Sequence, residues 1–188
     1  MKKLRIYDFD GVLFQHPSHC IQEMYREIPE ELMWRIGMEG GFFSSEMIAE
    51  NDIRPYYEAF VERYFSKKMS PENVLRLENE ARTAKLAIAS LNTRETIERH
   101  LEGSGIHHLF SVIFTRDDGC NKLEMLRRAC IGYDPATEVS FTTDTVDDIL
   151  AARALCPAMD VEIVVQGVDG WRSLVGYVGE GKIIAPFY

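Results

Sequence analysis

The sequence predicts an α/β protein with a mostly parallel five-stranded sheet and a small α-helical domain inserted after the first strand. Two observations support this fold class. In the second half of the chain, short apolar runs alternate with helical patterns, which is typical of parallel sheets. Between the first apolar run and the second, residues 15–83 carry helical patterns only, and this interval is too long for a simple connection.

Five apolar segments predict the strands. They are brief and rich in Val, Ile and Phe, and several end in polar or glycine residues. The predicted strands are Leu4–Phe9, Leu86–Ser90, Val112–Phe114, Val139–Thr143 and Val161–Val165. In a parallel sheet the carboxyl ends of the strands lie at one edge, and ligands of such folds bind beyond that edge.

Three helical patterns connect the later strands. Asn92, with Glu95 three residues on, is suited to cap the start of the first helix. Apolar residues then recur at helical spacing and form one face of each helix. These faces are Ile97 and Leu101 in the first helix, Leu123, Leu126 and Cys130 in the second, and Val146, Ile149, Leu150 and Ala154 in the third.

The chain is predicted to form two domains. Residues 1–14 and 84–188 form a core that contains the sheet, and residues 15–83 form the inserted helical domain. The C-terminal segment is glycine-rich and ends in an apolar stretch, so we expect it to complete the core or to support a dimer. The protein is accordingly expected to be a monomer or a homodimer.

Composition narrows the classes of partner. The net charge is -9, from 30 acidic and 21 basic residues, which argues against an extended nucleic-acid surface but allows a small anionic ligand. The four cysteines show no metal-site spacing, as is typical of free thiols in a reducing compartment. No apolar run is long enough to span a membrane. We therefore expect a cytoplasmic protein with no membrane partner.

Polar residues that could act in catalysis or bind a ligand lie at the ends of several predicted strands. Each lies at or just beyond a carboxyl end, so a parallel sheet would bring them to one edge. They are Asp8 and Asp10 at the end of the first strand, Ser90 and Asn92 at the end of the second, Lys122 after the third, and Asp144, Asp147 and Asp148 after the fourth.

This set of residue types suits a phosphate ester as substrate. Crowded carboxylates repel one another unless a cation lies among them, and Mg²⁺ prefers a few carboxylate oxygens together with water and phosphate oxygens. One aspartate can act as nucleophile and form an aspartyl-phosphate, while a second acts as general acid and base. The Lys122 ammonium and the Ser90 hydroxyl can bind phosphoryl oxygens.

Each residue taken alone also has a structural explanation. Asp147 and Asp148 in a first helical turn interact favourably with the helix dipole, and Lys122 alone is an ordinary solvated helix residue. What these explanations leave out is the arrangement, because each group follows a different predicted strand at its carboxyl end. The combination predicts a phosphoryl-transfer site.

These motifs resemble those of the haloacid dehalogenase (HAD) superfamily of phosphohydrolases, in particular its subfamily I, which includes phosphoglycolate phosphatases and β-phosphoglucomutases. The family's first motif, an apolar strand followed by D-x-D-G-[T/V], is matched by Asp8-Phe9-Asp10-Gly11-Val12. The second, third and fourth motifs are matched by Ser90, by Lys122, and by Asp144 with Asp148. Thr143 stands where the family often has Gly or Glu, and the usual K-P-x-P around the lysine is absent.

The resemblance implies a Rossmann-like core and a role for each matched residue. Asp8 would be the nucleophile and a Mg²⁺ ligand, and Asp10 would be the general acid and base, with its backbone carbonyl as a second ligand. Asp144 would bind Mg²⁺, as would Asp148 directly or through water, although Asp147 is adjacent and the choice between these two stays open. Ser90, Asn92 and Lys122 would bind the phosphoryl group.

The resemblance also bears on the reaction and the substrate. Family members with dehalogenase chemistry lack the second aspartate of the first motif, so Asp10 favours a phosphatase or a phosphomutase. A helical insertion directly after that motif resembles the C1 cap, which closes over small substrates such as sugar phosphates, phosphoglycolate or mononucleotides. Candidates for specificity residues in this cap are His16, His19 and Arg54.

Two alternative functions are considered beside a small-metabolite phosphatase. One is a HAD-type phosphatase for nucleic-acid ends, which the acidic charge and the lack of a basic tract with aromatic residues disfavour. The other is a HAD-like binding or regulatory module without catalytic activity, although every expected charged group is present in the sequence.

Overall fold

The computed structural model describes residues 3–15, 26–32, 54–166, 172 and 174–188. The chain divides into two compact units, one made of residues 1–15 and 68–188 and the other of residues 16–67. The first unit contains the sheet, and the second contains helix α4 (Arg54–Ser66). Among the described residues, no helix is long and apolar enough to cross a membrane.

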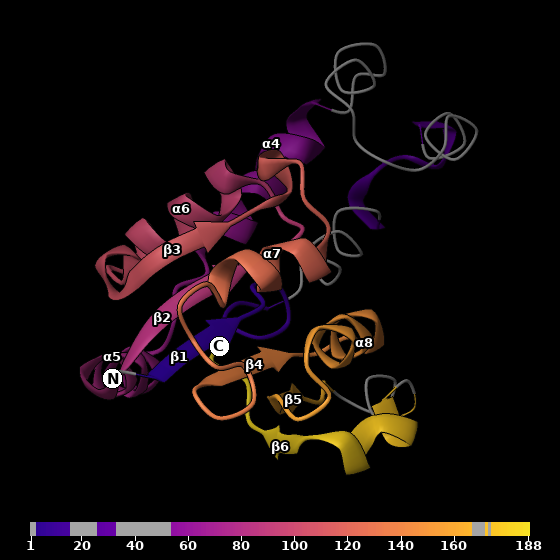
Figure 1. Cartoon of the computed structure of the whole chain (residues 1–188). Coiled ribbons are helices and arrows are strands. Elements are labelled where there is room, and N and C mark those ends of the chain that lie inside the picture. Colours follow the sequence, from indigo (N-terminus) through magenta and orange to yellow (C-terminus); the bar gives the residue numbers. More distant parts are fainter. Residues whose placement is uncertain (1–2, 16–25, 33–53, 167–171, 173) are drawn as a thin grey trace. The chain divides into compact units, whose positions relative to one another are not determined.

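The sheet has six parallel strands in the order β3-β2-β1-β4-β5-β6 (Figure 1). Their bounds are β1 Lys3–Tyr7, β2 Ala84–Ala89, β3 Phe110–Phe114, β4 Val139–Thr143, β5 Asp160–Val164 and β6 Lys182–Ile184. The predicted α/β class with a parallel sheet is therefore confirmed. The sixth strand was not predicted, because its three residues lie in a glycine-rich segment that lacks a recognisable strand pattern.

Helices cover both faces of the sheet, and the alternation of side chains along β1 shows which helices cover which face. Leu4 and Ile6 point into a cluster with residues of α7 (Lys122–Ala129) and α8 (Val146–Leu155). Tyr7 points into a second cluster, with residues of α5 (Pro71–Thr83) and α6 (Arg94–Gly103). The described part of this unit also contains short 3-10 turns at His107–Leu109, Arg116–Asp118 and Val175–Glu180.

Helix α5 differs from the expected domain boundary. The sequence pattern predicts an inserted domain that extends to residue 83, whereas α5 belongs to the compact unit of the sheet. Its Leu77 is fully buried in the same cluster as Tyr7, and Glu80 accepts a hydrogen bond from the Tyr7 hydroxyl. Apolar spacing predicts a helix but does not state which body the helix packs on, so the sequence pattern could not place this boundary.

Two finer predictions about the helices were wrong. The N-cap of α6 is Thr93 rather than Asn92, because it is the Thr93 hydroxyl that accepts a hydrogen bond from the Thr96 backbone N–H. In α8, Ile149 is fully buried as predicted, but Leu150 is 49% exposed and Ala154 is exposed as well.

The end of the C-terminal segment packs into the core, which is one of the two roles expected for this segment. Phe187 is fully buried, and its ring packs edge-on against Tyr7 with a centroid distance of 5.5 Å. The Phe187 backbone N–H donates to the carbonyl of Val12 at 2.9 Å. This segment therefore returns to the loop that follows β1, close to the predicted site.

Candidate active site

The first motif lies where β1 ends. Tyr7 is the last residue of the strand. The Asp8 backbone N–H still donates to the backbone carbonyl of Thr142 in β4 at 2.8 Å, which fixes the position of Asp8. The Asp8 side chain is buried, and its Oδ1 accepts from the Phe9 backbone N–H at 2.8 Å. Beyond it the chain turns through Gly11, whose φ of +78° favours glycine.

Lys122 connects the first and fourth motifs. Its ammonium nitrogen lies 2.9 Å from Asp8 Oδ1 and 2.7 Å from Asp148 Oδ2, and it donates to the backbone carbonyl of Ala89 at 2.8 Å. Burial lowers the pKa of this lysine, but the two carboxylates raise it by more, so the net pKa lies above its ordinary value. The group is therefore a fixed positive charge between two aspartates.

The structure distinguishes the two adjacent aspartates at the start of α8. Asp147 is exposed, whereas Asp148 is only 5% exposed. Asp148 Oδ2 also accepts from the Thr143 hydroxyl at 3.0 Å. Burial and the charge of Asp8 raise the pKa of Asp148, and Lys122 acts in the opposite direction. Of the two aspartates, only Asp148 makes a described contact with the other predicted site residues.

Ser90 and Asn92 follow β2 at the same edge. Ser90 is buried, and its Oγ accepts from the Asn92 backbone N–H at 3.2 Å, so its own O–H proton can still be donated elsewhere. The Asn92 side-chain amide donates to Asp10 Oδ2 at 2.9 Å. Asn92 therefore orients Asp10, a contact that the sequence analysis did not anticipate.

Asp144 has a different environment from the other carboxylates. Its Oδ2 accepts from the side-chain amide of Gln166 at 2.9 Å, and the same Gln166 nitrogen donates to the Gly11 carbonyl at 2.8 Å. Sequence analysis did not single out Gln166, because one glutamine after a strand is no recognisable signal. Burial, followed by the charge of Asp8, raises the pKa of Asp144 to about 7.

The donor set of this edge fits a hard divalent cation. Asp144 Oδ1 is buried and has no hydrogen-bond partner among the described residues, which is costly for a carboxylate oxygen unless a cation binds it. No group of three or more Asp, Glu, His or Cys side chains in the described ranges forms a metal centre by itself. Mg²⁺ is suited to such a site, because it takes few carboxylates and keeps several waters.

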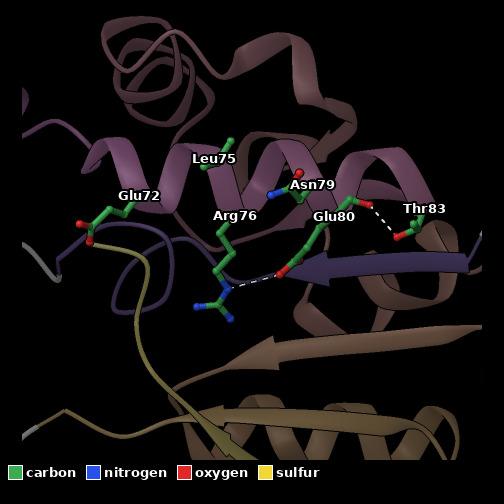
Figure 2. A pocket seen from close by; sticks show the side chains of 6 residues that line it. All are labelled: Glu72, Leu75, Arg76, Asn79, Glu80 and Thr83. Atoms are coloured by element: carbon green, nitrogen blue, oxygen red, sulfur yellow. Dashed lines mark hydrogen bonds and ion pairs between the residues drawn. The ribbon is translucent and has the colours of Figure 1, made fainter.

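The side chains of the specificity candidates in the inserted segment lie outside the described part of the chain. His16 and His19 lie outside the described residues, and Arg54 begins α4 but its side chain is outside the described part. A surface pocket lies elsewhere, along α5 (Figure 2). It is lined by Glu72, Leu75, Arg76, Asn79, Glu80 and Thr83, none of which is a predicted site residue.

The chain belongs to the haloacid dehalogenase-like hydrolase family, whose sequence profile matches residues 5–156. The match runs from β1 through α8 and includes all four motifs of the site. No curated protein sequence matches the chain.

Solved structures of HAD-like proteins share the fold. A protein assigned as a β-phosphoglucomutase from Thermotoga maritima has a TM-score of 0.69 at 20% identity, over 98% of this chain and 94% of that one. A protein assigned as a phosphatase from Clostridium difficile has a TM-score of 0.69 at 18% identity, over the same shares. A HAD hydrolase from Bacillus subtilis, solved with magnesium bound, has a TM-score of 0.59 at 14% identity, over 87% and 88%. Dehalogenases are also among the similar structures.

Proposed function

We propose that this protein is a Mg²⁺-dependent phosphatase that hydrolyses a small phosphorylated metabolite through an aspartyl-phosphate on Asp8. The observation that carries the proposal is the buried ion-pair arrangement in which the Lys122 ammonium contacts Asp8 at 2.9 Å and Asp148 at 2.7 Å. A cation fixed beside a nucleophilic carboxylate attracts the negatively charged phosphoryl group and offsets its charge.

Mg²⁺ would be held by Asp8, Asp144 and the Asp10 backbone carbonyl, with Asp148 binding it directly or through water. When bound, the ion supplies positive charge that offsets repulsion between the carboxylates and the phosphoryl oxygens. Support for this assignment comes from Asp144, whose Oδ1 has no hydrogen-bond partner among the described residues and whose pKa is raised to about 7.

The first half-reaction transfers the phosphoryl group to the protein. A carboxylate oxygen of Asp8 attacks phosphorus, and the bond from phosphorus to the ester oxygen breaks. The Asp10 carboxylic acid donates its proton to the departing alkoxide, so the alcohol leaves neutral. Asn92 holds the Asp10 carboxyl by an amide hydrogen bond of 2.9 Å, which keeps this acid in one orientation.

The second half-reaction releases inorganic phosphate. The Asp10 carboxylate removes a proton from a water molecule as the water oxygen attacks phosphorus. The bond from the Asp8 oxygen to phosphorus breaks, which restores the Asp8 carboxylate and leaves Asp10 protonated for the next cycle. Lys122 and the Ser90 hydroxyl bind the phosphoryl oxygens in both steps.

Asp10 favours this chemistry over dehalogenation. A dehalogenase expels halide, which needs no proton, whereas an alkoxide leaving group needs an acid such as Asp10. The inserted segment, residues 16–67, would act as a cap that admits only small substrates to the site.

The first experiment is an assay with Mg²⁺ against p-nitrophenyl phosphate and a panel of phosphorylated metabolites. We expect phosphate release, and a loss on the order of 10³-fold or more in kcat for Asp8→Asn, because the nucleophile is removed. Asp147→Asn is the matched control, because Asp147 is exposed in the first turn of α8. The activity of this variant should equal that of the wild type.

Other outcomes identify the alternatives. Halide release from 2-haloacids without phosphate release would replace the phosphatase proposal by a dehalogenase. Activity confined to phosphorylated oligonucleotide ends would indicate a nucleic-acid-end phosphatase. Mg²⁺ binding with no turnover of any of these would support a binding or regulatory module.

A further inference from the structure

We propose that Gln166 is a positioning residue of the metal site, which holds the Asp144 carboxylate by one oxygen and leaves the other directed at the cation. The inference rests on the proposed function, because it takes Asp144 as a Mg²⁺ ligand. Gln166 lies outside the four motifs and two residues beyond the end of β5.

The contacts of Gln166 join two motifs that are far apart in the sequence. Its Nε2 lies 2.8 Å from the Gly11 carbonyl oxygen and 2.9 Å from Asp144 Oδ2. A primary amide carries two N–H groups on one nitrogen, so both acceptors can be bonded at the same time. The side chain therefore links the loop after β1 to the tip of β4.

Because of this link, the two carboxylate oxygens of Asp144 have different surroundings. Oδ2 is occupied by the amide, while Oδ1 is buried with no hydrogen-bond partner in the described part of the chain. A ligand carboxylate that is held from behind by a hydrogen bond has a fixed orientation, and loss of such a partner weakens metal binding. We therefore assign Oδ1 as the oxygen that faces the cation.

Gly11 makes room for the arrangement. A Cβ atom at this position would collide with both Asp144 Oδ2 and Gln166 Nε2. The close approach thus depends on a residue without a side chain, at a φ of +78° that also favours glycine. The three residues form one packed unit at the carboxyl edge of the sheet.

An amide is suited to this position for electrostatic reasons. A lysine would neutralise Asp144 and compete with the cation, and a glutamate would add a further charge beside carboxylates that already repel one another. The neutral amide donates hydrogen bonds while it leaves the charge of Asp144 available.

The alternative is that Gln166 only ties two loops together, which would stabilise the fold without affecting the metal. Gln166→Met separates these roles, because methionine has nearly the same length but no N–H donor. Ser111→Ala is the matched control: the Ser111 hydroxyl donates to the Leu86 carbonyl at 3.0 Å, from an outer strand of the same sheet, so this variant also loses one hydrogen bond from a side chain to the backbone.

The measurement is titration calorimetry of the metal-free full chain with MgCl₂ alone, together with thermal unfolding in EDTA. We expect Gln166→Met to bind Mg²⁺ about 10- to 100-fold more weakly than the wild type. Its unfolding temperature in EDTA should fall no further than that of Ser111→Ala, whose Mg²⁺ affinity should be unchanged.

The outcomes separate this inference from the proposed function. If the wild type binds Mg²⁺ and Gln166→Met binds it equally well, the positioning role is wrong while the proposed function stands. If the wild type does not bind Mg²⁺, the metal-dependent function is wrong, and the role of Gln166 with it. Gln166→Asn, which keeps the amide but shortens its reach, is a second variant should the methionine variant not fold, and it should also bind Mg²⁺ more weakly.

Discussion

The carboxylates of the site differ in what surrounds each of them. Asp8 and Asp148 share the Lys122 ammonium, at 2.9 and 2.7 Å. Asp144 is held by the neutral amide of Gln166, and its pKa is raised to about 7 by burial and by its acidic neighbours. Asp10 receives an amide hydrogen bond from Asn92. Residues of one type thus have different hydrogen-bond and charge environments at the candidate site.

Gly11 offers a sharp test at the residue scale. Gly11→Ala should abolish Mg²⁺ binding and phosphatase activity, because the added Cβ would collide with Asp144 Oδ2 and Gln166 Nε2. Gly105→Ala is the control, since Gly105 has a similar φ of +71° but no atom within 4 Å of an added Cβ. Both variants should lose about 1 kcal/mol of stability from backbone strain, measured by urea unfolding. Equal Mg²⁺ affinity in the two variants would contradict the packing argument.

At the scale of elements, helix N-termini bring the functional groups to the edge of the sheet. Asn121 caps α7 directly before Lys122, and Thr145 caps α8 so that Asp148 lies in its first turn. Helix α8 starts just beyond the end of β4, and α7 starts after the 3-10 turn Arg116–Asp118 that follows β3. The backbone N–H groups and the dipole of a helix start favour anions. The capping residues therefore position the site as well as stabilise the helices.

Removal of the α8 cap tests this coupling. Thr145 accepts from the Asp148 backbone N–H at 3.4 Å, so Thr145→Ala should lower stability by about 1 kcal/mol and also reduce kcat/KM several-fold through displacement of Asp148. Ser70→Ala removes the equivalent cap of α5, where Ser70 accepts from the Asn73 N–H at 3.3 Å. That control should lose similar stability, measured by thermal unfolding, and keep its kcat/KM. A loss of kcat/KM in both variants would indicate a general effect of stability.

At the scale of the whole molecule, the buried Asp144 carboxylate lowers the folding stability of the metal-free protein. The pKa of Asp144 lies near 7 in the folded state, against an ordinary value of 3.8. Between these two values the folded state binds more protons than the unfolded state, so this group lowers stability as the pH rises from about 4 to about 7, and its effect is constant above that range. A bound cation favours the ionised form and so opposes this loss.

Asp144→Asn should remove this dependence. In EDTA at pH 8 the variant should unfold several degrees above the wild type, because a neutral amide replaces a carboxylate whose ionisation the buried site disfavours. At pH 4 the two proteins should be close in stability. At pH 8, added Mg²⁺ should stabilise the wild type but not Asp144→Asn. Unfolding temperatures at pH 4 to 8, with and without Mg²⁺, provide the measurement, with the exposed Asp147→Asn as control. A wild type that is no less stable than Asp144→Asn at pH 8 would overturn the argument.

Local patterns were sufficient to predict the main elements and to propose residues that the structure brings to one edge of the sheet. The strand Val139–Thr143 was predicted with its observed bounds, because a buried strand has a recognisable apolar run. Asp8, Ser90, Lys122 and Asp148 were each predicted from their positions after successive strands. Parallel topology converts that order into proximity, so the sequence by itself determined the class of fold and the edge at which these groups meet.

Only the tertiary structure decided how those groups are paired. The Gln166 amide contacts Gly11 and Asp144, which are 155 and 22 positions away along the chain. The placement of α5 on the sheet, the sixth strand and the burial of Asp148 rather than Asp147 are likewise set by packing between distant segments. Sequence periodicity reports which face of an element is apolar, but it carries no information about which distant side chain lies opposite, because that depends on how the elements pack together.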